Sequence, residues 1–472
     1  MFSKKLSFRN LRFISKVLAE AKACLLLAIP LAAAQLAQAG TNFFDTVMMG
    51  LLGSQSLAAG ALGAVTFSAL MLISTGIVSS VGILAAVADG AGESKQVSCV
   101  AVQGLWLSIA LSIPFMLLIW NMGPILRQFG QEPSNVILAE SYLRAIVWGF
   151  PASMGFAVLK NVVSALNRPR VVMVIMVGGV FLNVAANYVL MFGLWGLPAL
   201  GLAGIGWGST LSYWVMFATA VGFVSFNEHF KSYQIFPYFH QFNRRTFWEI
   251  FQIGWPIGLL FTFEAGLFAA TTFLMGYLGT VTLAAHQIAL QTAAMTFMVP
   301  VGISYATTIR VGQSIGKNDP KGAQQAGYVG IAIGAIFMGM MAVIFWIFPE
   351  RIVGIYLNVK APENLEVVKL AISLLGVAAM FQIFDGIQVI AAGALRGLKD
   401  TRVPMLIGVF AYWIVGFVSG YMMGIYLDWG GVGLWGGLAL GLAFASGILS
   451  WRFRHLVLRM SKEDFLTADE RR

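Results

Sequence analysis

Three carboxylic acids lie well inside apolar stretches of the sequence: Asp45, Glu264 and Asp385. A charge at the centre of a bilayer costs about 2.5–3.5 kcal/mol on insertion scales, so intramembrane acids usually face a cavity that carries a proton, an ion or a substrate. The alternative is a protonated acid that is hydrogen-bonded within a helix interface. Because three such acids occur and no Lys or Arg lies at comparable depth, we predict that they bind a proton, an ion or a cationic substrate.

Polar and aromatic side chains near these acids extend the candidate site. Amides four residues apart share one face of a helix, and aromatic rings bind cations through their faces. An amide in an apolar segment can instead form a hydrogen bond between two helices, which is the commoner role. The predicted cavity residues are Asn183, Asn187, Gln287, Gln291, Gln382, Phe263 and Phe381.

The elements that position these residues are apolar helices. The 472 residues are 58% hydrophobic and only 11% charged, with a mean hydropathy of +0.81, whereas soluble domains have about 25% charged residues. A helix needs roughly 20 apolar residues to span a bilayer. We predict an all-α polytopic membrane protein with twelve transmembrane helices, at residues 24–52, 57–88, 97–122, 136–165, 171–196, 201–226, 249–278, 283–313, 323–348, 366–395, 403–427 and 431–451.

Basic residues are divided unequally between the two sides of these spans. Of the 30 Lys and Arg, 25 lie in the tails and in alternate loops that share one side, and only Arg127, Arg351 and Lys360 lie in loops on the other. Cytoplasmic loops of membrane proteins are enriched in Lys and Arg. We therefore expect both termini to be cytoplasmic, in the inner membrane if the protein is bacterial. The net charge of +10 then reflects topology rather than nucleic-acid binding.

An internal repeat divides the chain into two halves. Residues 48–59, MMGLLGSQSLAA, match residues 274–285, LMGYLGTVTLAA, at seven of twelve positions. Each half holds six spans, so the halves share one orientation and are related by a pseudo-two-fold axis along the membrane normal. The predicted parts are a cytoplasmic N-terminal tail (1–23), an N-lobe (24–226), a cytoplasmic connection (227–248), a C-lobe (249–451) and a cytoplasmic C-terminal tail (452–472).

Several chemistries have no motif in this sequence. Gly316-Lys317 is followed by Asn318, so the nucleotide-binding pattern G-x-x-x-x-G-K-[ST] is not met. The four His and the two Cys, Cys24 and Cys99, have no metal-ligand spacing. We expect no ATP hydrolysis, no enzymatic reaction and no cofactor.

Three segments resemble the multidrug and toxic compound extrusion (MATE) family, in its NorM-like branch. They are FDTVMMG at 44–50, AAHQIAL through TIRVGQSIG at 284–316, and AAGALRGLKDTR at 391–402. They lie in both halves and keep the order of the family. The resemblance implies secondary active efflux of amphipathic organic cations in exchange for Na⁺ or H⁺, by alternating access of two lobes in the lipid bilayer. We expect the protein to act as a monomer.

In the N-lobe, Asp45 matches the family's first-helix aspartate, and Asn183 and Asn187 match its fifth-helix polar pair. Some relatives carry an acid where Asn187 stands. An N-lobe proton site in this chain would therefore rest on Asp45 alone.

In the C-lobe, Glu264 and Asp385 match the family's acids associated with cation binding, and Gln287 matches a cavity-lining glutamine. The two acids are therefore the candidate Na⁺ site. Na⁺-coupled NorM proteins often have Tyr one turn before the tenth-helix acid, where this chain has Phe381. The ring is kept and the hydroxyl is lost, which leaves Na⁺ and H⁺ both open as the coupling ion.

Two other functions are open at this point. A flippase for lipids or lipid-linked precursors belongs to the same superfamily, although the flippases of peptidoglycan synthesis have extra helices and a basic cavity. A channel fits the composition, although a repeat with an acid in each lobe favours an exchanger. Counter-transport and saturation distinguish an exchanger from a channel.

The unequal charge distribution predicts the topology. Epitope tags in residues 1–20, in the 227–248 connection and at the C-terminus should all be accessible only from the cytoplasm, because the loops on that side carry most of the Lys and Arg. Impermeant labelling of intact cells measures this, with a tag in the loop after Arg127 as the control on the opposite side. Labelling of the connection from outside would contradict the six-plus-six arrangement.

Overall fold

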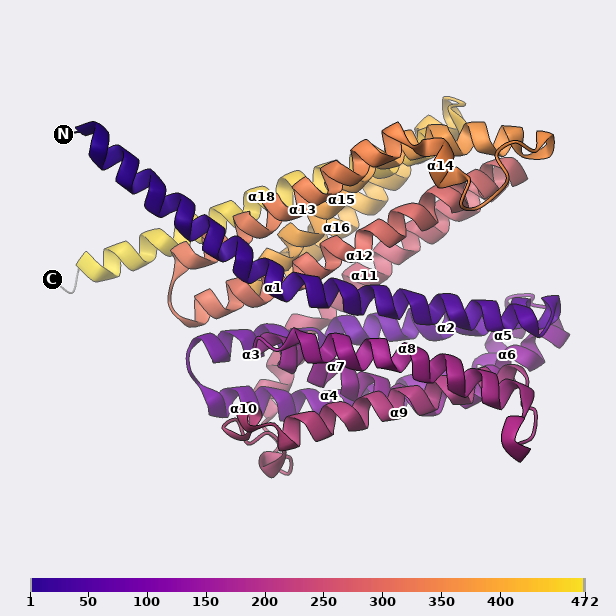
Figure 1. Cartoon of the computed structure of the whole chain (residues 1–472), viewed down its shortest axis with the longest axis horizontal. Helices are drawn as coiled ribbons and strands as arrows, with labels where there is room; N and C mark the ends of the chain where they lie inside the picture. Colours follow the sequence, from indigo (N-terminus) through magenta and orange to yellow (C-terminus); the bar gives the residue numbers. More distant parts are fainter. Residues whose placement is uncertain (1, 470–472) are drawn as a thin grey trace. The chain divides into compact units, whose positions relative to one another are not determined.

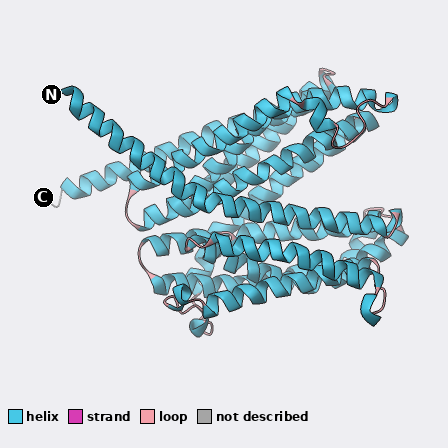
Figure 2. Cartoon of the chain, viewed as in Figure 1, coloured by secondary structure: helices cyan, strands magenta, loops and turns pink. Residues whose placement is uncertain are grey.

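The computed structural model describes residues 2–469, with side chains described for 14–237 and 239–461. The described chain is helical with short loops, and none of its residues lies in a β-strand (Figure 2). This confirms the predicted all-α class. The longer helices are α1 (Phe2–Leu51), α2 (Ser54–Val78), α3 (Ser80–Gly90), α4 (Ser94–Trp120), α6 (Pro133–Ile146), α7 (Phe150–Ala165), α8 (Pro169–Phe192), α9 (Leu202–Phe226), α11 (Arg244–Tyr277), α12 (Thr280–Gly316), α13 (Pro320–Ile347), α15 (Leu365–Gly397) and α18 (Gly430–Asp469).

Twelve helical segments of the described chain are long and apolar enough to cross a membrane. This confirms the predicted number of spans. Helices α2 and α3 form one span, as do α6 and α7. The eleventh span is composite, since α16 (Arg402–Val409) continues into a π-helical segment η5 (Phe410–Phe417), then α17 (Val418–Tyr421) and a second π-helical segment η6 (Met422–Tyr426).

The chain forms two compact units. One, here called the α2–α9 unit, is Ala33–Phe261, and the other, the α12–α18 unit, is Met1–Ala32 with Thr262–Arg472. In the α2–α9 unit, α8 packs along α9, α4 packs on α7, and α6 packs on α9 (Figure 1). Large side chains such as Phe150, Met154 and Leu159 are fully buried there.

In the α12–α18 unit, α15 is the central helix and packs on α12, α13 and α18 (Figure 1). Two glycines of α15 allow the close approach to α12, because a Cβ at Gly393 would clash with Ser304 and one at Gly397 would lie 2.8 Å from the Thr308 carbonyl oxygen. Hydrogen bonds join the two helices there, since the hydroxyl groups of Ser304 and Thr308 on α12 donate to the carbonyl oxygens of Val389 and Gly393 on α15, at 2.7 and 2.8 Å. The small residues of the AAGALRG segment are thus packing residues.

The repeat is visible in the backbone at the turn after the first helix of each half. Gly53 (φ 103°) precedes α2 and Gly279 (φ 120°) precedes α12. Both lie in a region of positive φ that side-chain-bearing residues rarely adopt. The same turn therefore occurs at both positions of the sequence repeat.

The unit boundaries fall inside α1 and α11 rather than in the 227–248 connection. The start of α11 packs in the α2–α9 unit, where the Ser80 hydroxyl donates to the Ile250 carbonyl oxygen at 2.8 Å. The start of α1 packs in the α12–α18 unit, where Arg310 donates to both carboxylate oxygens of Glu20 at 2.8 and 2.6 Å. The lobes at 24–226 and 249–451 are defined by the sequence repeat rather than by these contacts, and they stay a prediction.

One native cysteine offers a test of the packing of α1 on α12. Cys24 is 1% exposed and shares a hydrogen bond with Thr307. A Thr307→Cys variant should therefore form a disulfide with Cys24 on oxidation, because a disulfide requires the two side chains to lie close together. A protease site in the 227–248 connection allows detection, because the two fragments then stay joined until a reductant is added.

Thr308→Cys is the matched control for this cross-link. The Thr308 hydroxyl donates to backbone oxygens of Ser304 and Gly393, so it faces α15 and the variant should not cross-link. Equal cross-linking of the two variants, or none in either, would contradict the described packing of α1.

Candidate functional site: acids on the helices of both units

In the α2–α9 unit, Asp45 of α1 belongs to a closed ring of hydrogen bonds. The Asn187 side-chain amide donates to Asp45 Oδ1 at 2.6 Å and to Asn183 Oδ1 at 3.1 Å. Asn183 donates to Ser209 Oγ at 3.1 Å, and the Ser209 hydroxyl bonds back to the Asp45 carboxylate. The predicted residues Asp45, Asn183 and Asn187 are thus brought together, with Ser209 of α9 as a fourth member.

Close packing of α8 on α9 holds this ring in place. Gly208 lies directly against Asn187, and a Cβ there would clash with Asn187 Oδ1 and lie 2.7 Å from its backbone nitrogen. Tyr142 and Tyr213 are close enough to interact electrostatically with Asp45. Among the described residues, Asp45 has no salt-bridge partner, and its hydrogen bonds come from the neutral side chains of Asn187 and Ser209.

In the α12–α18 unit, Glu264 of α11 and Asp385 of α15 lie within electrostatic range of each other. Asp385 is only 5% exposed. Its Oδ1 is buried and has no hydrogen-bond partner in the described part of the chain. Buried polar atoms are nearly always hydrogen-bonded, so an unsatisfied carboxylate oxygen is suited to holding a proton or a metal cation.

The π-helical segment η5 places two aromatic residues around these acids. The Gln388 side-chain amide, one turn after Asp385, donates to Tyr412 Oη at 2.6 Å, and Tyr412 interacts electrostatically with both acids. The next residue, Trp413, donates its ring N–H to the carbonyl oxygen of Phe263 at 3.2 Å. Gln388 Oε1 is a second buried acceptor without a partner among residues 14–237 and 239–461.

The expectation that no base lies near the acids is wrong. Arg396 is 7% exposed inside the α12–α18 unit and interacts electrostatically with Glu264. Arg396 follows the predicted span at 366–395 and is therefore expected in a loop, but α15 continues to Gly397. Glu264 therefore has a cation in electrostatic range, unlike Asp45.

The other predicted residues of the α12–α18 unit are distributed over its buried and exposed faces. Gln382 is buried and its Oε1 accepts from Thr296 at 3.1 Å. Phe381 is buried against Phe268 and Trp435, with ring centroids 6.2 and 5.2 Å apart, so its faces contact other rings. The remaining three are exposed side chains, namely Phe263, Gln287 and Gln291.

His286 beside this site is structural. Its Nδ1 accepts from Trp435 Nε1 at 3.1 Å, and its Nε2 lies 3.0 Å from Thr272 Oγ1. The Thr272 hydroxyl hydrogen already goes to the Phe268 carbonyl oxygen, so Nε2 is the donor and the imidazole is neutral. No group of three or more His, Cys, Asp or Glu suited to a metal ion occurs among the residues the structure describes.

A family model described as MatE matches residues 30–189 and 256–422 of this chain. The two matched segments begin at Pro30 and Pro256, 226 residues apart, which is the offset of the sequence repeat. The chain belongs to the MatE family. Each matched segment contains acids of the candidate site, Asp45 in one and Glu264 with Asp385 in the other.

Relatives of this MatE chain match it over nearly their whole length. It is 40% identical to the probable multidrug resistance protein NorM of Synechocystis sp., over 93% of this chain and 96% of the relative. It is 42% identical to the probable multidrug resistance protein NorM of Pseudomonas aeruginosa, over 94% and 91%. It is 38% identical to the multidrug resistance protein NorM of Burkholderia vietnamiensis, over 90% and 92%.

Solved structures share the MatE fold. A crystal structure of MATE in the straight conformation has a TM-score of 0.85 at 19% identity and covers 94% of this chain and 97% of its own. The crystal structure of the eukaryotic MATE transporter AtDTX14 has a TM-score of 0.80 at 21% identity, over 94% and 99%. These similarities, with the twelve apolar helices, establish the chain as a multi-pass integral membrane protein.

A substitution that adds one methyl group tests the hydrogen-bond ring around Asp45 in this MatE chain. Gly208→Ala should push Asn187 away from Asp45, because its Cβ has no room, and overpacking in a close-packed core costs typically about 1–3 kcal/mol. The melting temperature of the purified protein in detergent should fall by about 1–3 °C. Gly222→Ala on the same helix is the control, since nothing lies within 4 Å of its Cβ and Ala favours a helix. An equal melting temperature for the two variants would mean that Gly208 does not hold the ring.

Proposed function

We propose that this protein is a secondary active multidrug efflux antiporter that exports amphipathic organic cations in exchange for Na⁺ or H⁺. Membership of the MatE family and about 40% identity to multidrug resistance proteins named NorM support multidrug efflux. Their coverage of nearly the whole chain means that both halves needed for transport are represented. The transport cycle is alternating access of the lobes at 24–226 and 249–451.

One observation carries the proposal of ion coupling. Asp385 Oδ1 and Gln388 Oε1 are buried oxygens, one helical turn apart on α15, and neither has a hydrogen-bond partner among the described residues. Two unsatisfied acceptors beside the carboxylate of Glu264 offer oxygen ligands for Na⁺, and either carboxylate offers a place for a proton. A cation bound there neutralises the carboxylate charge and is coordinated by the lone pairs of both oxygens. Because an unpaired charge or polar atom in an apolar environment costs free energy, the bound cation stabilises these oxygens.

Exchange follows from competition for the same negative charges. A cationic drug and the coupling ion both neutralise these carboxylates, so binding of one disfavours binding of the other. Net exchange then requires that the ion and the drug favour different conformations of the lobes, because a ligand shifts an equilibrium only by its difference in affinity for the two states. The Phe263 ring, exposed beside Glu264, supplies a face for an organic cation.

Asp45 has a separate task in this scheme. It has no cation in salt-bridge distance among the described side chains, and its hydrogen bonds come from neutral groups. We assign it to a second site, which takes up a proton or the cationic substrate. The amides of Asn183 and Asn187 orient its carboxylate, and they would reorganise when its charge is neutralised.

The proposal includes a location and an assembly state. The charge distribution supports both termini in the cytoplasm, and for a bacterial protein the membrane is then the inner membrane. The acid sites are each completed by residues of one unit of one chain, so a monomer has all the groups that transport requires.

Reconstitution into liposomes tests the function directly. Efflux of a panel of fluorescent organic cations should be saturable and should respond to an imposed gradient of Na⁺ or of H⁺, applied separately. A response to only one gradient identifies the coupling ion. Flux that neither saturates nor shows counter-transport would identify a channel, and movement of lipid analogues instead of cations would identify a flippase.

Glu264 and Asp385 should behave as one coupling site. Glu264→Gln and Asp385→Asn each keep the side-chain size and remove a carboxylate, and each should lower ion-driven efflux by at least about tenfold, or about 1.4 kcal/mol. The double variant should be little worse than either single variant, since residues that act as a unit are not additive. The measurement is the initial rate of gradient-driven efflux at equal amounts of reconstituted protein.

The control for these variants is Glu366→Gln, which removes an exposed acid from the first turn of the same helix as Asp385. It should transport at the parental rate. Independent losses that multiply in the double variant, with gradient-dependent transport surviving in each single variant, would show that the two acids do not share a site.

A further inference from the structure

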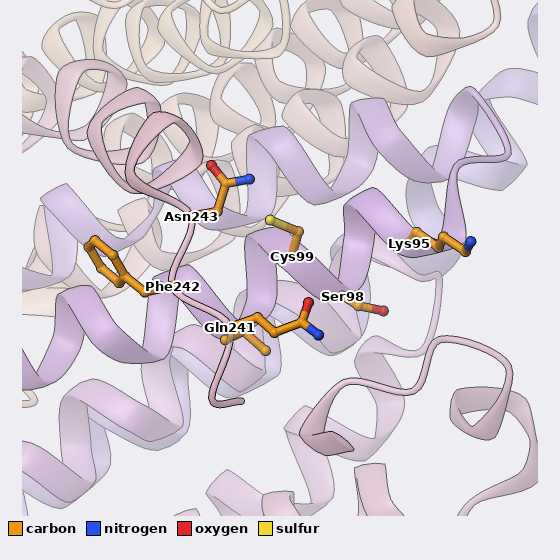
Figure 3. Close-up of a pocket in the computed structure, with 7 residues that line it drawn as sticks. Lys95, Ser98, Cys99, Gln241, Phe242 and Asn243 are labelled. Atoms are coloured by element: carbon orange, nitrogen blue, oxygen red, sulfur yellow. The ribbon is translucent and has the colours of Figure 1, made fainter. Parts of the chain in front are cut away.

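A pocket lies at the start of α4 in the α2–α9 unit, and its lining contains none of the residues of the Asp45 ring. It has a volume of about 400 Å³. One wall is the first turns of α4, and the other is the end of the connection that leads into α11 (Figure 3). The labelled lining residues are Lys95, Ser98, Cys99, Gln241, Phe242 and Asn243.

The connection that forms one wall is fastened to α4. The Gln103 amide donates to the carbonyl oxygen of Gln241 at 2.8 Å, and the Trp106 ring N–H donates to that of Phe239 at 3.0 Å. The Trp106 and Phe239 rings are also stacked, with centroids 5.3 Å apart. These bonds make the wall a fixed part of the unit, so the pocket is formed before any ligand arrives.

A tyrosine fastens the connection at a second point. The Tyr233 hydroxyl donates to Asp89 Oδ1 at 3.1 Å, and the Ser98 hydroxyl bonds to the Tyr233 carbonyl oxygen. Partial burial and the Asp89 carboxylate raise the pKa of Tyr233 to about 12. The phenol therefore stays protonated and keeps donating throughout the physiological pH range.

The lining of the pocket is rich in hydrogen-bond donors and contains no carboxylate. Lys95 supplies an ammonium group at one end, and Gln241 and Asn243 supply amide N–H groups. The pocket also lies where two helices begin, since α4 starts at Ser94 and Asn243 Oδ1 accepts from the backbone N–H of Thr246 at the start of α11. Helix N-termini carry partial positive charge, so this chemistry favours an anion.

The pocket also has an apolar side. Val102 lines it on α4, and the Phe242 ring is 57% exposed. It lies on the side of the spans that carries most of the Lys and Arg, and Arg244 and Arg245, both exposed, follow directly in the chain. Basic pockets between membrane helices on the cytoplasmic side are suited to anionic lipid headgroups.

We propose that this pocket binds the phosphate group of an anionic phospholipid of the cytoplasmic leaflet. The phosphate contacts Lys95 and the amide donors of Gln241 and Asn243, and the glycerol and first methylenes of the lipid lie along Phe242 and Val102. A lipid so placed bridges the first turns of α4 and α11. The apolar side favours a lipid over a free phosphate ion, which has the same anionic chemistry but no apolar part.

The native thiol in the pocket reports its occupancy. Cys99 lines the pocket and is partly exposed, whereas Cys24 is 1% exposed. In nanodiscs of phosphatidylcholine, an impermeant maleimide should therefore label the full-length chain mainly at Cys99. Added phosphatidylglycerol should slow this labelling about tenfold once its concentration is about ten times its Kd. Cys99→Ser measures the background.

Matched variants separate the pocket from the general membrane charge. Lys95→Gln should lose most of the protection by phosphatidylglycerol, whereas Lys231→Gln, an exposed residue of the connection outside the pocket lining, should keep it. A thiol introduced by Ser232→Cys into the Cys99→Ser background should not be protected.

Each other outcome overturns the proposal. Equal slowing of the Ser232→Cys thiol would mean that phosphatidylglycerol acts only through surface potential. Protection by inorganic phosphate in phosphatidylcholine nanodiscs would assign the pocket to a free anion. No protection by phosphatidylglycerol, or equal protection in the Lys95→Gln variant, would mean that no anionic lipid is bound through Lys95.

Discussion

A carboxylate among apolar helices must be met by donors, by a positive charge or by a proton, and this constraint organises both units. In the α2–α9 unit the requirement is met by neutral donors, arranged as a ring that includes Asp45, Asn187 and Ser209. In the α12–α18 unit Glu264 has the buried cation Arg396 in electrostatic range, and Asp385 Oδ1 and Gln388 Oε1 are buried acceptors without a partner among the described residues. The two halves repeat in sequence, yet the groups that surround their carboxylates differ.

Much of the fold could be predicted from the sequence because its strongest signal is physical and local. A helix in a bilayer must be apolar for its whole length, so the spans and their number follow from composition, and the Gly53 and Gly279 turns follow from the repeat. The three acids and the amide pair in α8 were also identifiable, since polar residues inside such spans are rare and expensive.

The remaining site residues gave weaker signals. Arg396 lies so near the end of a span that hydropathy assigns it to the loop, and only the extension of α15 to Gly397 buries it. Gln388 has the same one-turn spacing from Asp385 as Gln382, and that spacing could have identified it. Ser209 and Tyr412 belong to other helices, and only the tertiary packing brings them to the acids.

The π-helical segments of the eleventh span occur where that span is longer than the fifth span, which carries the Asn183–Asn187 pair. Arg170-Val171 and Trp195-Gly196 flank the fifth span, and the same dipeptides, Arg402-Val403 and Trp429-Gly430, flank the eleventh. The spacing is 25 residues in the first case and 27 in the second.

A π-helical turn closes its hydrogen bonds over five residues instead of four, so η5 and η6 accommodate two inserted residues within one span. The fifth span thus presents two amides to Asp45, whereas the longer eleventh span presents the Tyr412 hydroxyl to the amide of Gln388.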